Sequence, residues 1–435
     1  MAIHANPYAV NTALKSSTES KSSADISRPI FDYSLEALRG LAALLVVFEH
    51  SIGNGPTPDP SYHISGFWQY APPGHLSVMV FFMLSGYVIG LANSKPITTN
   101  SGRKLYLKKR IVRLYPLYLL TLAATFSVAV MYHTPAGAGT IIGCLLFLQG
   151  LVVKVPAYNN PIWSLGYEIL YYVLFLVVSA RRWAPGWVAV AFLAFGLILS
   201  QLAIQPIILV SYAYGAVFWF LGQFLSRMPK STNPLQFGTM LAFLLLMLSF
   251  QRMNLMFSAL HSLQLDVTEA QAPSWFDRAI VFSDFSLLLY CVPLLLCFTN
   301  RTMPGRRWME LAAFATPGLY FLSYIYSGKI QQTQLFNTVI ISAVFYLLAI
   351  AAYLLRHHST LLGEAIIQKL TPLGHISYGI YIIHFPLFFL FHQVKTFSGT
   401  ATSFLVRLLL YLVLVIFLGW ALERRLQPWL KEKLM

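Results

Sequence analysis

The stretch LEALRGLAALLVVFEH, residues 35 to 50, decides the fold class of this chain. It is apolar enough to begin a membrane helix, yet it carries Glu36, Arg39, Glu49 and His50. A charged group in the hydrocarbon region of a bilayer is costly unless it faces protein or water. We therefore expect this segment to be a helix inside a bundle, with its ionisable stripe turned toward neighbouring helices.

The chain as a whole has the composition of a polytopic membrane protein, because 57% of its 435 residues are hydrophobic and only 10% are charged. Apolar blocks recur near the roughly 20 residues that a membrane-spanning helix needs. The candidate spans are residues 35–52, 76–93, 114–132, 161–179, 186–204, 208–226, 235–250, 279–298, 312–328, 335–355, 373–394 and 401–421. The block at 312–328 is the weakest, and 141–153 is short enough to be re-entrant or interfacial. We predict an all-α bundle of about ten to twelve transmembrane helices.

The charged residues outside these blocks predict how the chain is organised. Residues 1–30 end in a polar run and lack the apolar core of a secretory signal, so we expect a disordered cytoplasmic tail before a single transmembrane domain at 31–435. The net charge of +15 comes from basic clusters between apolar blocks, such as 104–113 and 305–307. The positive-inside rule places these clusters and both termini in the cytoplasm, and no nucleic-acid partner is needed to explain them.

The three cysteines predict neither a disulfide framework nor a metal site. Cys144, Cys291 and Cys297 are odd in number, unmatched in spacing and embedded in apolar runs. We interpret them as small buried hydrophobic residues.

Arg39 and His50 share one face of the first helix. They are eleven residues apart, which at about 100° each is three turns plus about 20°. Glu36 lies three residues before Arg39 and can pair with it. Histidine is the side chain most suited to proton transfer near neutral pH, so His50 is a candidate general base. The alternative is an interfacial arginine and a neutral histidine bonded to a backbone carbonyl.

A basic segment follows the second span, in RKLYLKKRIVRLYPLY. Arg110 and Arg113 are three residues apart at the mouth of a helix, a spacing that can offer two guanidinium groups to one polyphosphate. Lys109 adds charge beside them. The alternative is a topogenic cytoplasmic loop that contacts lipid phosphates.

Two further segments place polar side chains inside apolar helices. Ser85 and Gly86 interrupt the bulky residues of FFMLSGYVIG, where close helix packing is the favoured interpretation of the pair taken alone. Glu168 follows Trp163 into an apolar helix. A lone carboxylate there must be protonated or paired, so it is a natural partner for a histidine or a substrate hydroxyl.

The last candidate segment is LGHISYGIYIIHFPLF, which places Tyr381 and His384 three residues apart on one helix face, with Ser377 one turn before Tyr381. Pro386 is expected to bend this helix. A packing role and a functional role for His384 are equally compatible with the sequence.

Five collinear motifs together resemble the acyltransferase family 3 of membrane-bound acyltransferases. They span about residues 33 to 430. The motifs are Arg39 and His50 in the first helix, Phe82 with Ser85 and Gly86, Arg110 and Arg113 before Pro116, Trp163 to Glu168, and Ser377 to His384. Each one alone is a weak match, whereas their order and spacing are specific.

The resemblance implies transfer of an acyl group, usually acetyl, from cytoplasmic acyl-coenzyme A to a hydroxyl of a glycan or another acceptor. By this likeness His50 is the catalytic base, and Arg110 and Arg113 hold the coenzyme A phosphates. Arg39 helps to order the ionisable side chains on the same face of the first helix. Lys109, Ser85 and Gly86 are assigned with Arg110 and Arg113 to the donor site. Independently of this likeness, Glu168, with Glu49 as the alternative, is expected to orient the imidazole of His50. Trp163, Tyr381 and His384 are assigned to substrate binding, and no metal is expected.

Several alternatives stay open at the level of sequence. A transporter of a lipid-linked or free saccharide fits the span count and the buried ionisable groups equally well, and an inactive scaffold for glycan assembly is a third possibility. For the enzyme, a small-molecule natural product is the alternative acceptor, and an acyl-histidine intermediate is the alternative to direct transfer. We expect the bacterial cytoplasmic membrane as its location, lipids as neighbours, and homo-oligomers as one possible assembly.

Overall fold

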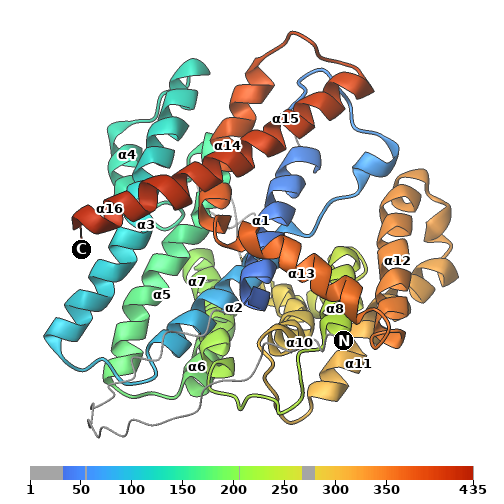
Figure 1. The fold of residues 1–435 in the computed structure, drawn as a ribbon, viewed down its shortest axis with the longest axis horizontal. Coiled ribbons are helices and arrows are strands. Elements are labelled where there is room, and N and C mark those ends of the chain that lie inside the picture. Colours follow the sequence, from blue (N-terminus) through green and yellow to red (C-terminus); the bar gives the residue numbers. More distant parts are fainter. Residues whose placement is uncertain (1–32, 54–55, 205, 267–279, 435) are drawn as a thin grey trace, which may run out of the picture. The chain divides into compact units, whose positions relative to one another are not determined.

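The computed structural model describes residues 33–53, 56–204, 206–266 and 280–434, so the predicted tail at 1–30 lies outside the described residues. Within these ranges the regular structure is helical and no strand is formed, which confirms the predicted all-α fold (Figure 1). The α-helices are α1 (Tyr33–Ile52), α2 (Gly74–Ala92), α3 (Asn100–Met131), α4 (Ala138–Leu145), α5 (Trp163–Ala180), α6 (Pro185–Ser200), α7 (Ile207–Leu225), α8 (Phe237–Phe250), α9 (Leu255–His261), α10 (Leu288–Phe298), α11 (Arg306–Tyr326), α12 (Thr333–Leu354), α13 (Thr360–Gly374), α14 (Ser377–Gln393), α15 (Ala401–Trp420) and α16 (Gln427–Leu434). Short helical turns are η1 (Gly66–Gln69), η2 (Ala157–Ile162), η4 (Phe282–Leu287), η5 (Lys329–Gln331) and the π-helical η6 (Ala421–Leu426).

Each of the twelve predicted spans overlaps one or two of these helices; the span at 279–298 covers η4 and α10 with residue 279 outside the described residues, and the span at 373–394 crosses the bend between α13 and α14. In the described part of the chain, five continuous helices are long and apolar enough to cross a membrane, and the number is seven if α8–α9 and α13–α14, bent by 46° and 68°, each form one span. The apolar segments at 185–200, 282–298 and 339–354 are shorter, and α1 carries three charged residues. This count is below the predicted ten to twelve, but it is that of a multi-pass membrane protein.

The basic segment before Pro116, which the sequence placed at the mouth of a helix with a cytoplasmic loop as the alternative, lies within a helix. Helix α3 already begins at Asn100, and the Thr99 side chain caps it by accepting a hydrogen bond from the Gly102 N–H. Lysine and arginine are good helix formers, so a run of charge that interrupts the hydropathy signal does not interrupt the helix. Lys109 and Arg110 therefore stand on a continuous helix.

The short apolar stretch 141–153 is not one straight helix, because α4 ends at Leu145 and is followed by turns.

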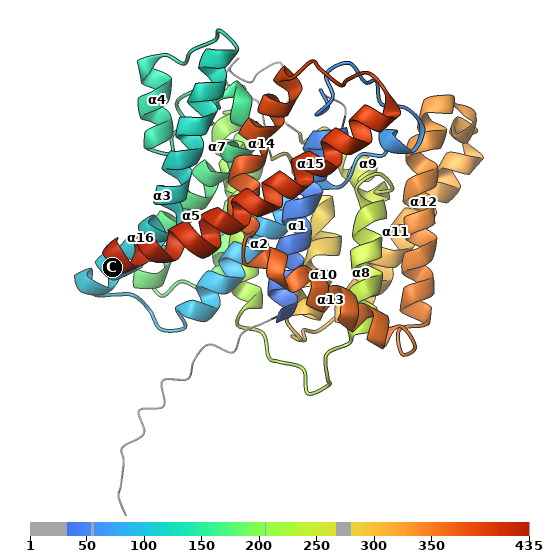
Figure 2. The same cartoon turned by 45° about the horizontal axis from the view of Figure 1, so that its top comes forward.

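Helix α1 packs against α2, α13 and α14, which brings segments from both ends of the chain together (Figures 1 and 2). The crossing of α1 and α13 depends on two glycines. A Cβ atom on Gly374 would lie 1.9 Å from the Glu36 carbonyl oxygen, and one on Gly40 would lie 2.7 Å from the Gly374 nitrogen. Small residues let the two backbones touch. The sharp bend that follows directs α14 alongside α1.

A buried carboxylate joins the connection after α1 to the turn between α14 and α15. Asp59 accepts hydrogen bonds from the hydroxyls of Ser398 and Ser403, the latter at 2.6 Å, and from the backbone N–H groups of Gly399 at 3.0 Å and Ser61 at 3.1 Å. Burial acts to raise the pKa of the Asp59 carboxyl, but these hydrogen bonds outweigh burial and hold the pKa below its ordinary value of 3.8. The charged form therefore stabilises the fold.

We expect Asp59→Asn to destabilise the protein at neutral pH by about 1–3 kcal/mol, because the amide replaces a charged acceptor of several hydrogen bonds. The stabilisation is present above the ordinary pKa of an aspartate and is lost as the pH falls below 3.8 through the lowered folded-state value. Thermal unfolding in detergent at pH 7 and pH 3 measures this difference. If the difference in unfolding temperature between the variant and the parent were the same at both pH values, this prediction would be wrong.

Candidate active site

A cavity of about 600 Å³ opens among α1, α2, α3, α5, α14 and α16. Its volume is within the range of small-molecule and cofactor sites. The predicted site residues that line it are Arg39, Ser85, Lys109, Arg110, Arg113, Glu168 and Tyr381. Positions far apart in the sequence thus meet around one space.

Several basic side chains line the cavity. Lys109 and Arg110 on α3 face it together with Lys431 on α16, a residue that no sequence motif indicated. The Arg110 guanidinium lies over the rings of Tyr106 and Tyr172, 5.6 and 5.8 Å from their centroids. Its Nε is buried without a hydrogen-bond partner among the described residues. Arg110 therefore keeps donor capacity that a bound anion would satisfy.

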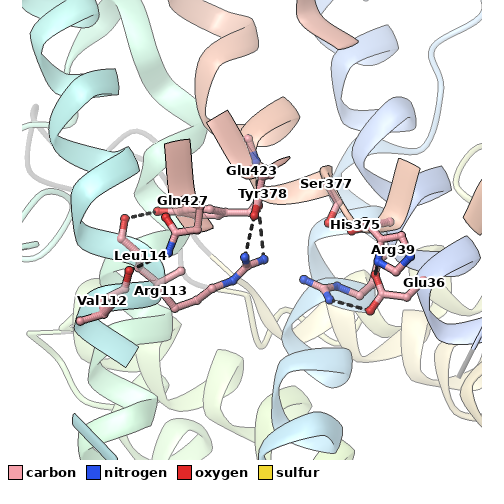
Figure 3. A network of polar contacts seen from close by, with 12 residues as sticks. Glu36, Arg39, Val112, Arg113, Leu114, His375, Ser377, Tyr378, Glu423 and Gln427 are labelled. Atoms are coloured by element: carbon pink, nitrogen blue, oxygen red, sulfur yellow. Dashed lines mark hydrogen bonds and ion pairs between the residues drawn. The ribbon is translucent and has the colours of Figure 1, made fainter. Parts of the chain in front are cut away.

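Arg113 lies in a different environment from Arg110, although both were predicted to bind phosphate. Figure 3 shows the Arg113 guanidinium pointing toward Glu423. The guanidinium donates to both carboxylate oxygens of Glu423, at 2.6 and 3.3 Å, and the Gly379 N–H also donates to Glu423 at 3.3 Å. Glu423 stands in the π-helical turn η6, and such turns often occur at functional sites. Its charge offsets that of Arg113, so the two arginines do not form an open fork.

Arg39 reaches the cavity from α1 and pairs with Glu36 at 3.1 Å, which confirms the predicted pairing three residues apart (Figure 3). The other oxygen of Glu36 lies 3.8 Å from Nδ1 of His375, at the bend between α13 and α14. The carboxylate of Glu36 thus holds Arg39 against the junction of these helices.

His50 pairs with His384 across the interface of α1 and α14. Nδ1 of His50 lies 3.0 Å from Nε2 of His384, and the two rings stack with centroids 5.2 Å apart. Nδ1 of His384 lies 2.7 Å from the Tyr381 carbonyl oxygen, which can only accept a hydrogen bond. His384 therefore carries its proton on Nδ1 and accepts at Nε2 from His50. In neutral His50 the lone pair is then on Nε2.

This pair lies next to the cavity without lining it, and Tyr381 connects the two. The Tyr381 side chain forms part of the cavity wall, its carbonyl binds His384, and its hydroxyl donates to the Pro161 carbonyl at 2.9 Å. His384, assigned from sequence to substrate binding, is thus the direct partner of the predicted base. No local motif could have indicated this, because 334 residues separate the two histidines.

Glu168 was expected to orient His50, but it bonds elsewhere. Its Oε1 accepts from the hydroxyls of Ser85, at 2.9 Å, and Tyr172. The Trp219 indole N–H donates to Ser85 at 3.3 Å. Glu168 therefore belongs to the wall of the cavity, and His384 takes the position beside His50.

Two predicted site residues, Trp163 and Gly86, pack against neighbouring side chains or helices instead of lining the cavity. Trp163 is buried, with its ring 5.2 Å from that of Tyr167 and 6.2 Å from that of Phe82. Gly86 faces α7, where a Cβ atom would lie 1.8 Å from the Trp219 carbonyl oxygen. Neither residue lines the cavity.

Gly86→Ala is accordingly expected to lower stability by about 1–3 kcal/mol, because an added methyl group must push α2 and α7 apart. Unfolding followed by tryptophan fluorescence in detergent measures the loss. Gly139→Ala is the matched control, since nothing lies within 4 Å of a Cβ atom there. An unchanged unfolding temperature combined with a raised KM for an acyl donor would instead support the assignment of Gly86 to donor binding.

Comparison with known proteins gives the family. The model of the acyltransferase domain of the acyltransferase 3 family matches residues 32–424. Protein 2 in the picA locus of Rhizobium radiobacter is 39% identical over 93 residues, covering 20% of this chain and 41% of that protein. Acyltransferase MdmB of Streptomyces mycarofaciens is 27% identical, covering 29% and 36%, and a candidate acetyltransferase, ORF330, of Acidianus two-tailed virus is 28% identical, covering 39% and 47%.

The chain therefore matches less than half the length of each of these relatives. No solved structure matches it. The family match covers nearly the whole described bundle and agrees with the resemblance carried by the five sequence motifs. This chain belongs to the acyltransferase 3 family of membrane proteins.

Proposed function

We propose that this protein is a membrane O-acyltransferase. It moves an acyl group, most readily acetyl, from acyl-coenzyme A to a hydroxyl of a cell-surface or lipid-linked polysaccharide at the bacterial cytoplasmic membrane. The observation that carries the proposal is the hydrogen-bonded pair of His50 and His384, which lies beside a cation-lined cavity and is joined to it by Tyr381.

The residues of the cavity fit a polyphosphate donor. Arginine and lysine are the usual ligands of phosphate groups, and Lys109, Arg110 and Lys431 all line this space. The buried Nε of Arg110 needs an acceptor that the described residues do not supply. We assign these three residues to the phosphates of coenzyme A. Arg113 attracts the phosphates more weakly, because its charge is offset by the bound Glu423 carboxylate.

The proposed chemistry uses His50 as the general base. Its Nε2 takes the proton of the acceptor hydroxyl while the hydroxyl oxygen attacks the thioester carbonyl carbon. A C–O bond forms, the C–S bond breaks, and the thiolate of coenzyme A leaves and takes up a proton. Throughout the reaction, Nε2 of His384 accepts a hydrogen bond from Nδ1 of His50 and so keeps the His50 proton on Nδ1. In the alternative order, His50 itself attacks and carries the acyl group before the acceptor arrives.

The proposal is tested with the purified full-length chain in lipid nanodiscs. We expect radiolabel from acetyl-coenzyme A to appear on a saccharide acceptor with stoichiometric release of free coenzyme A. A panel of lipid-linked saccharides and small hydroxylated natural products separates the two acceptor classes.

A saccharide transporter remains the second candidate function, because buried ionisable groups are also typical of transporters. Proteoliposomes loaded with the same acceptors discriminate the two. Movement of the acceptor across the bilayer without consumption of the acyl donor would replace the proposed function with transport.

A further inference from the structure

Glu168 is an acidic residue in a cavity whose other charged lining residues are Arg39, Lys109, Arg110, Arg113 and Lys431 among the described residues. A carboxylate repels phosphate, so it cannot serve the part of the donor that the cations attract. Carboxylate oxygens accept hydrogen bonds and do not donate them. The natural ligand of Glu168 is therefore a neutral part of the donor that carries N–H or O–H groups.

The position of Glu168 relative to Arg110 matches the order of two parts of the donor, its phosphates and the neutral arm that follows them. The Arg110 guanidinium lies 5.8 Å from the centroid of the Tyr172 ring, and the hydroxyl of the same tyrosine donates to Glu168. The carboxylate thus lies one aromatic ring beyond the cation. In acyl-coenzyme A, the first amide of the pantetheine arm lies a few bonds beyond the phosphates.

The hydrogen bonds of Glu168 leave one oxygen for a ligand. Both Ser85 and Tyr172 donate to Oε1, and no described residue donates to Oε2. The bond from the Trp219 indole to Ser85 fixes this arrangement from the side of α7. The carboxylate is therefore held in place at the cavity wall before any ligand arrives, which reduces the cost of ordering it on binding.

We propose that Glu168 binds the amide N–H groups of the pantetheine arm of the acyl donor and is not part of the proton-transfer machinery. The inference rests on the proposed function. An amide that enters the cavity loses its hydrogen bonds to water and needs a protein acceptor. His384 already fixes the tautomer of His50, so the chemistry does not require a second orienting group.

The test is a series of acetyl donors that lose these groups in steps: acetyl-coenzyme A, acetyl-pantetheine, which lacks the nucleotide and pyrophosphate, and S-ethyl thioacetate, which lacks the amides as well. Glu168→Gln is the test variant because it keeps the shape of the side chain. We expect its KM to rise about 10- to 100-fold for the first two donors, since a hydrogen bond to a charged acceptor is lost. Its kcat, its pH profile and its activity with S-ethyl thioacetate should match the parent.

Two further variants calibrate this series. Arg110→Ala should raise KM for acetyl-coenzyme A and leave acetyl-pantetheine unaffected, because only the former has the phosphates. Glu364→Gln, on α13 and bonded to Gln368, is the matched control for loss of a carboxylate outside the cavity and should match the parent with every donor. Monodisperse elution and an unchanged unfolding temperature establish that Glu168→Gln is folded.

The outcomes separate the inference from the function on which it rests. A fall in kcat of Glu168→Gln with all three donors, together with a changed pH profile, would make Glu168 a catalytic residue. Unchanged kinetics with all three would also overturn the pantetheine assignment. If the parent protein transfers acetyl from none of the donors to any acceptor, the proposed function itself fails.

Discussion

Replacing His50 with alanine is expected to reduce acyl transfer about 10²- to 10⁴-fold, the usual contribution of a positioned general base. The effect should be on kcat, with little change in KM for the donor, because His50 is beside the cavity and does not line it. Initial rates of coenzyme A release from the variant in nanodiscs measure the loss. His63→Ala, at an exposed histidine in the connection after α1, is the matched control.

A labelling experiment on the parent protein decides between the two proposed orders of reaction. With the parent protein and radiolabelled acetyl-coenzyme A in the absence of acceptor, an acyl-histidine mechanism leaves a labelled protein, and mass spectrometry locates the label on His50. Direct transfer leaves the protein unlabelled. Parent-like activity of His50→Ala would remove His50 from the mechanism.

Replacing His384 with alanine is expected to lower kcat by about 10²-fold, because His50 then loses the hydrogen bond that selects its tautomer. Loss of a charged orienting carboxylate from a histidine costs about 10⁴-fold, and a neutral imidazole partner should cost less. KM for the donor should change little, since His384 is fully buried and does not line the cavity.

Rescue by a conservative variant distinguishes positioning from packing. The side-chain oxygen of glutamine in His384→Gln can accept from Nδ1 of His50 and should recover part of the lost kcat, whereas His384→Leu fills a similar volume and should not. His358→Ala, an exposed histidine between α12 and α13, controls for loss of an imidazole elsewhere. Equal activity of the glutamine and leucine variants would show that His384 acts through packing alone.

Local interactions in this protein were predictable from the sequence. The all-α fold, the twelve apolar segments that overlap helices, and the Glu36 and Arg39 pair all depend on residues within a few positions of one another. Helical periodicity determines which side chains share a face. It does not determine which helix that face will meet. The predicted span at 114–132 begins later than α3, which starts at Asn100, because hydropathy, unlike helix propensity, falls at charged residues.

The partners across helices were decided by tertiary structure. His50 meets His384 over 334 residues of sequence, and Arg113 meets Glu423 over 310. Both contacts depend on where α14 and η6 lie, and α14 is placed by the bend after α13 and by the close crossing at Gly40 and Gly374. The sequence by itself thus determined the helices, their membrane character and all but one, Lys431, of the charged residues that line the cavity. Only packing assigned their partners, because backbone approach between distant helices depends on the fit of whole surfaces rather than on any local pattern.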